Sequence, residues 1–151
     1  MSAIDDLFQR LQSEGRKAFM PFITAGDPDL ELTVDLIREL DRRGCQLCEV
    51  GIPYSDPIAD GPVIQASYTR ALQRGFRLHD LWEAVAGLQN DCPMPRVTMV
   101  SYAIVRRAGM QAYIEQAQSA GFAGAIVPDL PVEEASDMRA ACAAADFSLI
   151  Q

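Results

Sequence analysis

The sequence predicts an α/β protein built around a parallel β-sheet. Short apolar segments rich in β-branched and aromatic residues alternate with longer segments whose apolar residues recur at helical spacing. Glycine and proline lie in most of the breaks between segments, as expected for turns. Apolar residues make up 49% of the 151 residues, which is enough for one sizeable core. Alternating strands and helices are typical of parallel strands joined by right-handed crossovers.

The first 51 residues predict two helix–strand pairs. Apolar residues at helical spacing indicate a helix over 4–11. Aromatic and β-branched residues indicate a strand over 17–24, although Pro21 removes one donor from its ladder. A second helix over 30–40 ends at two arginines and a glycine, which favour a helix C-terminus. The second strand is predicted over 46–51.

The middle of the chain predicts a loop, two helices and a third strand. Prolines and aspartates mark 53–62 as the loop. Helical spacing continues over 63–74 and 78–88, and we expect the His79-Asp80 region to cap the second of these helices. The third strand is predicted over 97–102.

The last third of the chain predicts two further helices and two strands. A helix over 110–117 leads to a fourth strand over 123–127. Pro131 fits the start of the next helix, which runs to about Ala144, because its missing N–H costs nothing there. We expect Asp129 to cap that helix. A fifth strand begins at 147–150.

Two arrangements of these elements satisfy the pattern: an open doubly wound sheet, or part of a (β/α)8 barrel. The predicted order is a leading helix, four strand–helix units and a final strand, in a single domain over 1–151. A complete barrel needs about 250 residues. The chain would therefore supply a little over half of one, and the pattern alone leaves both arrangements open.

The net charge of the chain argues against some classes of binding partner. Thirteen basic and 21 acidic residues give a net charge of −8 without a long basic run, so neither a nucleic-acid nor a membrane surface is expected. A phosphorylated substrate is compatible, because backbone N–H groups can bind phosphate. No segment is apolar over the roughly 18 residues of a membrane span. The N-terminus lacks the features of a signal peptide, so we expect a cytoplasmic protein.

The cysteines predict no metal centre. Cys45 and Cys48 form a lone C-x-x-C, and a zinc site would need a second pair or histidines, of which His79 is the only one. Residues three apart on a strand point to opposite faces, so these thiols should not converge. We expect reduced, buried thiols.

Reactive groups of parallel α/β folds lie at the carboxyl ends of strands, which draws attention to Glu49. It shares a strand face with Leu47, while Cys48 and Val50 face the other way. In a partly apolar setting, desolvation would raise the pKa of this carboxyl and suit it to acid/base catalysis. The alternative is an exposed glutamate, or one paired with a lysine or arginine.

Asp60 can supply a second carboxylate on the same rim. Spacing alone favours a different role, as a loop aspartate that caps the helix after Gly61. Asp56 and Asp27 have the same ordinary interpretation.

A long motif in this region resembles a known family. Residues 49–65 (E-V-G-I-P-Y-S-D-P-I-A-D-G-P-V-I-Q) resemble the signature of the tryptophan synthase α subunit. Two further matches follow the family's order, F-I-T-A-G-D-P over 22–28 and G-F-A-G-A-I-V-P-D-L-P-V-E-E over 121–134. The resemblance covers essentially all 151 residues.

The resemblance implies a (β/α)8 TIM barrel, of which this chain is the N-terminal part: a leading helix, strands 1–4 with their helices and the start of strand 5. It implies a lyase that cleaves indole-3-glycerol phosphate to indole and glyceraldehyde 3-phosphate. Glu49 matches the family's catalytic acid/base, and Asp60 matches the aspartate that accepts a hydrogen bond from the indole N–H. No metal or organic cofactor is implied for this subunit.

The same resemblance implies binding surfaces. Phe22 and Tyr102 match positions that line the indole pocket, and Thr24 lies near them. Pro53 and Asp56 match a loop that contacts the tryptophan synthase β subunit in an α2β2 assembly. Pyridoxal phosphate is expected only in that β subunit.

Two departures from the family affect these expectations. Ile104 stands where the family usually has asparagine, which removes a loop hydrogen bond. The loops after strands 7 and 8, which hold phosphate in such barrels, have no counterpart in 151 residues. We expect a fragment of a longer enzyme, with negligible lyase activity alone and a tendency to associate. The alternative function is a non-catalytic module that docks on a β subunit and modulates it.

Overall fold

The structure is a computed structural model that describes residues 2–57 and 60–151. Its helices are α1 (Ala3–Ser13), α2 (Leu30–Arg42), α3 (Pro62–Gln73), α4 (Leu78–Ala86), α5 (Tyr102–Ala108), α6 (Met110–Ser119), a 3-10 turn η1 (Val132–Glu134) and α7 (Ser136–Ala144). Its strands are β1 (Phe22–Thr24), β2 (Cys48–Gly51), β3 (Arg96–Met99), β4 (Gly124–Ile126) and β5 (Ser148–Ile150).

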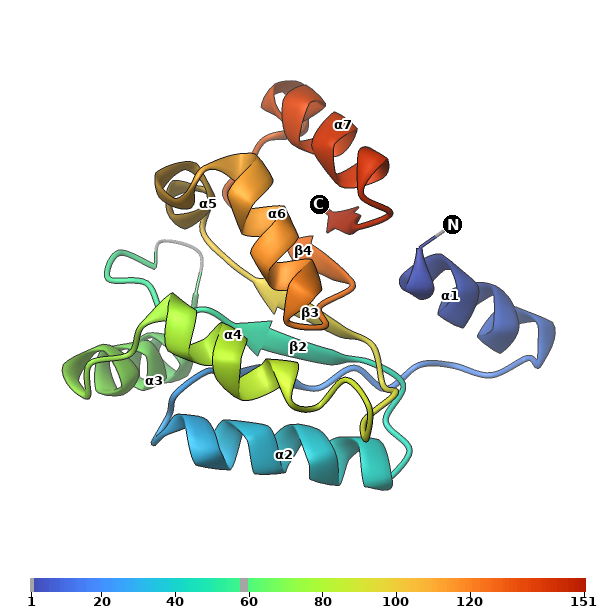
Figure 1. The fold of residues 1–151 in the computed structure, drawn as a ribbon, viewed down its shortest axis with the longest axis horizontal. Coiled ribbons are helices and arrows are strands. Elements are labelled where there is room, and N and C mark those ends of the chain that lie inside the picture. The colour runs from blue at the N-terminus through green and yellow to red at the C-terminus, as the bar shows by residue number, and fades with distance from the viewer. Residues whose placement is uncertain (1, 58–59) are drawn as a thin grey trace.

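The strands form one parallel sheet in the order β1-β2-β3-β4-β5 (Figure 1). Each strand pairs with the next in the chain, so the order never reverses. A doubly wound sheet requires such a reversal, whereas a barrel is wound continuously. The sheet order therefore excludes the doubly wound arrangement.

The outer face of the sheet carries the main core. Alternate strand residues such as Cys48, Val50 and Ala125 are fully buried against the helices. An aromatic cluster anchors this layer, with the Trp82 ring meeting Tyr113 and Phe122 edge-on at centroid distances of 5.8 and 5.4 Å. Such pairs stabilise beyond the area that they bury.

The inner face of the sheet carries a smaller core under α1, which lies apart from the other helices (Figure 1). Leu7 and Leu11 of α1 pack with Leu47 and Val97. Since Glu49 lies two residues after Leu47, its side chain is on this inner face, as predicted.

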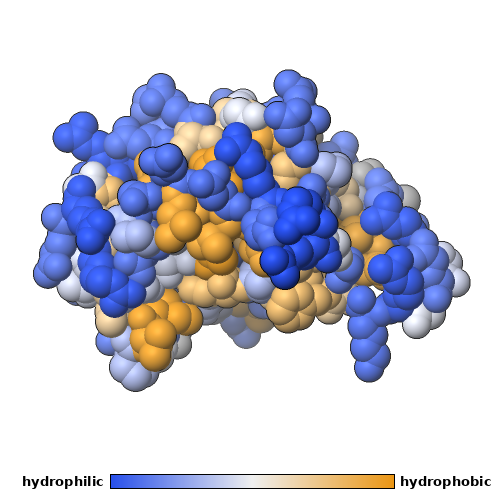
Figure 2. Space-filling model, turned by 90° about the horizontal axis from the view of Figure 1, so that it is seen from below, coloured by the Kyte–Doolittle hydropathy of each residue, from blue (hydrophilic) through white to orange (hydrophobic). Residues whose placement is uncertain are grey.

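Apolar side chains also remain exposed on the outside of the molecule. Seen from below, on the side where α2 lies, they gather in the middle of the face among charged residues (Figure 2). Large exposed apolar residues occur in the N-terminal segment, α2, α3 and η1: Phe8, Phe19, Met20, Leu32, Leu36, Val63, Leu72 and Val132. No helix in the described ranges is long and apolar enough to cross a bilayer.

The third predicted strand was too long. It ends at Met99, and one further bond to β4 runs from the Val100 N–H to the Ile126 carbonyl. Ser101 then caps α5 by accepting a hydrogen bond from the Ala103 N–H. The predicted strand residue Tyr102 is therefore the first residue of a helix that the sequence analysis missed.

Three further predictions were wrong in detail. The first strand is shorter than predicted and begins after Pro21, whose ring nitrogen has no hydrogen to donate. The helix predicted from Pro131 is divided into η1 and α7. The α4 N-cap is Arg77, without a side-chain hydrogen bond, so the His79-Asp80 region does not cap it. The four cysteines are free, as predicted, and Cys45 is only half-buried.

Candidate active site

Glu49 is a half-buried carboxyl in the second strand of the sheet. Its Cα pairs with Phe22 of β1 and Val97 of β3, so apolar residues flank it on both sides. Burial raises its pKa above the ordinary value. Its carboxylate has no ion pair or hydrogen bond within residues 2–57 and 60–151. Within the described residues, therefore, Glu49 is not paired with a lysine or arginine, which was the alternative to a catalytic role.

Gly51 lies two residues after Glu49 on the same inner face and is closely covered. A Cβ at this position would meet the Phe22 ring, and it would lie 2.8 Å from the Tyr68 hydroxyl of α3. Only glycine leaves room for both rings. The absence of a side chain at Gly51 thus brings Phe22 and Tyr68 together directly beyond Glu49.

Asp60 lies at the mouth above this point. It is half-buried, and burial raises its pKa. Gly61 is the N-cap of α3 and no side chain caps that helix, so Asp60 does not have the capping role that spacing favoured. Gln65 holds the loop, because its Nε2 donates to the carbonyls of Asp60 at 2.8 Å and Pro57 at 3.2 Å.

A cavity of about 40 Å³ lies at the carboxyl ends of β2, β3 and β4. Asp60 and Tyr68 line it from one side, and Ser101 and Asp129 line it from the loops after β3 and β4. Glu49 does not line this cavity but lies deeper on the inner face, below Gly51. Residues 58 and 59 of the motif fall outside the described residues.

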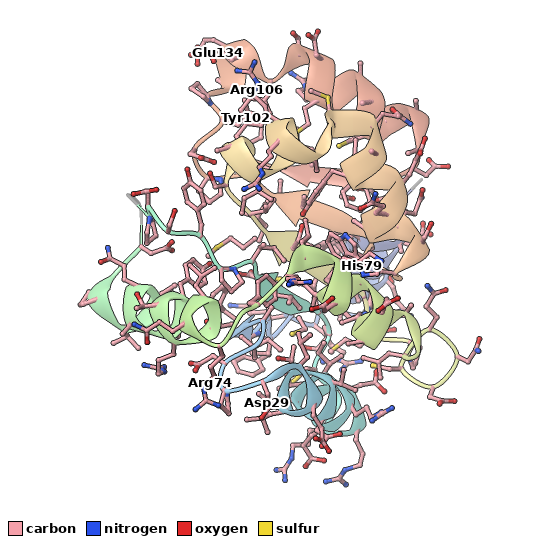
Figure 3. All side chains as sticks on the ribbon, turned by 60° about the vertical axis from the view of Figure 1, so that its left-hand side comes forward. Asp29, Arg74, His79, Tyr102, Arg106 and Glu134 are labelled. Atoms are coloured by element: carbon pink, nitrogen blue, oxygen red, sulfur yellow. The ribbon has the colours of Figure 1, made fainter. Side chains whose placement is uncertain are left out.

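The other predicted site residues lie around the same rim. Thr24 pairs with Gly51 and shares a 2.7 Å hydrogen bond with Ser67 of α3. Tyr102 is half-buried at the start of α5, on the same side of the molecule as Arg106 (Figure 3), and does not line the cavity. Pro53 is buried in the wall of a separate groove between the 52–55 loop, α4 and α5.

Asp56 and Ile104 are the remaining residues that the sequence singled out. Asp56 is exposed and accepts a 2.8 Å hydrogen bond from Ser55. Ile104 is half-buried and packs against the outer-layer core, so its side chain makes an apolar contact and no hydrogen bond.

Asp129 has a role that the sequence analysis did not find. We expected it to cap the following helix, but its carboxylate accepts hydrogen bonds from the Ser101 hydroxyl at 2.7 Å and the Tyr102 N–H at 2.8 Å. It therefore joins the loop after β4 to the start of α5. The two loops are neighbours only because β3 and β4 pair in the sheet, so no local sequence pattern predicts the contact.

Replacing Asp129 by alanine should loosen this rim. We expect Asp129→Ala to lower the free energy of unfolding by about 1 kcal/mol, because an exposed helix-capping carboxylate is lost. Urea denaturation would measure the change. Asp91→Ala is a matched control, since that exposed carboxylate has no hydrogen-bond partner in the described part of the chain. Equal effects of the two substitutions would contradict the bridging role.

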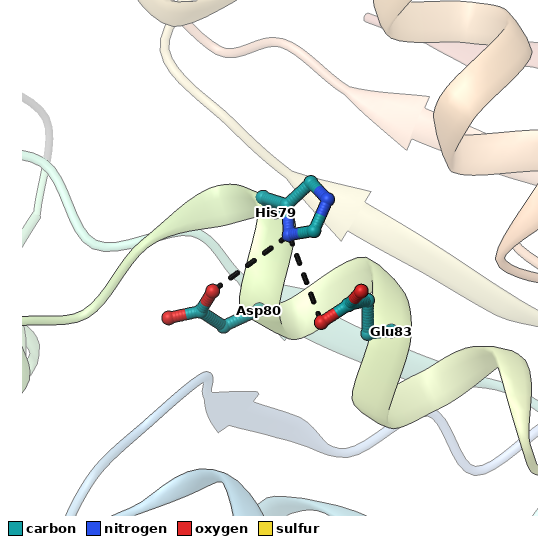
Figure 4. Close-up of side chains that lie close together, drawn as sticks. All are labelled: His79, Asp80 and Glu83. Carbon is teal, nitrogen blue, oxygen red and sulfur yellow. Dashed lines mark ion pairs between the residues drawn. The ribbon is translucent and has the colours of Figure 1, made fainter.

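One cluster of potential metal ligands occurs within the described residues, and it lies outside this site. His79, Asp80 and Glu83 project from the exposed side of α4 (Figure 4). The His79 Nδ1 lies 3.8 Å from an Asp80 oxygen and 3.7 Å from a Glu83 oxygen. None of the three lines the cavity at the strand ends.

Sequence comparison identifies the family. The sequence model described as "Tryptophan synthase alpha chain" matches residues 8–151. The chain belongs to the tryptophan synthase alpha chain family. A member of this name from Rhodopirellula baltica is 53% identical over 154 residues, covering 100% of this chain and 55% of the relative. Another from Microcystis aeruginosa is 45% identical over 150 residues, covering 99% and 57%. The chain thus spans a little over half the length of these relatives.

Solved tryptophan synthase structures have the same fold. The alpha subunit from Legionella pneumophila superposes with a TM-score of 0.93 at 35% identity, over 99% of this chain and 57% of that one. A second structure comes from Pyrococcus furiosus and is described as the structural basis of mutual activation of the tryptophan synthase α2β2 complex. It superposes with a TM-score of 0.83 at 36% identity, over 87% of this chain and 56% of that one. The five strands and their helices are therefore the N-terminal part of a TIM barrel, as predicted.

Proposed function

We propose that this chain carries the acid/base half of a lyase that cleaves indole-3-glycerol phosphate to indole and glyceraldehyde 3-phosphate. Family membership supports the reaction. The observation that carries the proposal is the half-buried Glu49 on the inner face, unpaired among the described residues, with Phe22 beside it and Asp60 at the mouth above it.

Glu49 is the general acid/base of the proposed reaction. Its raised pKa lies nearer to neutrality, so one carboxyl can both accept and deliver a proton. The glycerol hydroxyl next to the ring loses its proton, the bond to indole C3 breaks as a carbonyl forms, and C3 receives a proton. The atoms balance without water, oxidant or reductant.

Asp60 stabilises the ring in the proposed transition state. When C3 is protonated, positive charge develops on the indole and is shared by its nitrogen. A carboxylate that accepts a hydrogen bond from the N–H opposes this charge most strongly where water is excluded. The partial burial of Asp60 supports this role.

The remaining assignments follow from family membership and position. Phe22 contacts the indole ring, with Thr24 and Tyr102 near it, and neither metal nor organic cofactor takes part. Pro53 and Asp56 contact a tryptophan synthase β subunit, which holds pyridoxal phosphate. The α2β2 complex described for Pyrococcus furiosus supports such a partner. We place the reaction in the cytoplasm, within tryptophan biosynthesis.

A barrel chimaera tests the proposal. In this chimaera residues 1–151 are joined to the segment of the Rhodopirellula baltica relative that they do not match. We expect the chimaera to release indole from indole-3-glycerol phosphate, and the 151 residues alone to release negligible indole. A folded chimaera without activity, both alone and with a β subunit, would contradict the proposal.

A further inference from the structure

Tyr68 of α3 lies between Glu49 and the cavity at the strand ends, a position that the sequence did not predict. Tyr68 is 3% exposed, and it lines the cavity at the strand ends together with Asp60. Its hydroxyl lies over the inner face of β2, next to the Phe22 ring, where a side chain at Gly51 would otherwise lie. The hydroxyl is therefore at the junction between the deeper carboxyl Glu49 and the mouth.

This hydroxyl makes no hydrogen bond to the residues that the structure describes. Buried tyrosine hydroxyls normally have a partner. The neighbouring Ser67 does not serve, because its hydroxyl is engaged with Thr24 and with the Ile64 carbonyl, both at 2.7 Å. The Tyr68 hydroxyl is thus available to a group that faces the cavity.

Several ionisable groups face the cavity with Tyr68: Asp60, Asp56 and Tyr54 on the loop after β2, and Asp129 on the loop after β4. Asp56 is bound to Ser55, and Asp129 is bound to Ser101 and the Tyr102 N–H. Asp60 is the cavity carboxylate whose side chain has no hydrogen bond in the described part of the chain.

The negative charge of Asp60 also acts on the Tyr68 phenol. Burial, and secondarily the negative charge of Asp60, raise the pKa of Tyr68. The phenol consequently remains a neutral donor through the pH range in which Asp60 is ionised.

We propose that Tyr68 is a positioning residue for Asp60: its hydroxyl donates a hydrogen bond to the Asp60 carboxylate when a nitrogen heterocycle occupies the mouth. This inference rests on the proposed function. A donor to the ionised carboxylate offsets its desolvation and holds it toward the ring N–H. Asp60 can then carry a negative charge in a site that excludes water.

Tyr68→Phe tests the proposal, because it removes the hydroxyl and keeps the ring. Carbon-detected NMR of the full chain would follow the Asp60 carboxyl through a pH titration, with and without indole. With indole bound, we expect the Asp60 midpoint to be higher in Tyr68→Phe than in the unsubstituted chain, since a bond to the charged form is lost. We also expect indole to bind about 10-fold more weakly, the factor for one hydrogen bond to a charged group. Calorimetry would measure that affinity.

Tyr113→Phe is the matched control. It also removes one buried phenolic hydroxyl, which donates to Thr98 Oγ1 at 2.9 Å in the outer layer. We expect it to lower the thermal midpoint without moving the Asp60 titration. An Asp60 midpoint that is unchanged in Tyr68→Phe, or moved equally by both variants, would overturn the proposal. A shift of the same size without indole would also overturn it, because the contact would then not depend on the heterocycle. Indole binding with an unchanged Asp60 midpoint counts against the contact alone, whereas failure of the unsubstituted chain to bind indole counts against the proposed function on which the contact rests.

Discussion

Glu49→Gln should abolish most of the indole-forming activity of the barrel chimaera. We expect kcat to fall by about 10²–10⁴-fold, because the amide can neither accept the hydroxyl proton nor deliver one to indole C3. The substitution keeps the size and shape of the side chain, so substrate binding should change much less than kcat. A coupled assay for glyceraldehyde 3-phosphate, run beside direct detection of indole, measures the loss.

The same substitution should leave the fold intact. The pKa of Glu49 is raised in the folded state, so the ionised side chain opposes folding at neutral pH. At pH values between the unfolded and folded pKa, the native state binds more protons than the unfolded state. The free energy of unfolding therefore falls as pH rises through this range. Glutamine removes this dependence, so the variant should be at least as stable as the parent at neutral pH. Glu31→Gln on the exposed side of α2 is the matched control.

Retained turnover in Glu49→Gln would show that Glu49 is not the general acid/base of the reaction. If indole formation is lost and activation of a β subunit persists, the lyase assignment is supported. If the parent chimaera forms no indole but activates a β subunit, and Glu49→Gln leaves that activation unchanged, the chain acts instead as a docking module for that subunit.

Asp60→Asn should reduce kcat by about 10²–10³-fold, the range for removing one preorganised electrostatic contact. Asparagine can still accept a hydrogen bond from the indole N–H, but it carries no charge to oppose the charge on the ring. Because that charge develops in the transition state, kcat should fall more than KM rises. Steady-state kinetics of the chimaera provide both constants.

Asp91→Asn provides the comparison for Asp60→Asn, since it makes the same change at an exposed turn. The fold should tolerate Asp60→Asn, because burial raises the pKa of the aspartate and a neutral side chain avoids the desolvation cost. An unchanged kcat with a raised KM would show that Asp60 contributes to binding alone.

Much of the local structure could be predicted from the sequence, because it depends on neighbours in the chain. The sequence pattern correctly located α1, α2, α3, α4, α6 and all five strands, although β1 and β3 are shorter than predicted. Some of the errors lie where a distant contact decides the conformation. The end of β3 is one case, since Asp129 reaches across from another loop to hold the start of α5.

The sequence by itself determined the class of the fold, and through the 49–65 motif it singled out Glu49 and Asp60. The tertiary structure decided which strands are neighbours, and so excluded the doubly wound sheet that the helix–strand pattern had left open. It also brought Tyr68 over Gly51, next to Asp60. The physical reason is that periodicity records which face of an element is buried, whereas the contact between α3 and β2 depends on strand pairing between residues far apart in the chain.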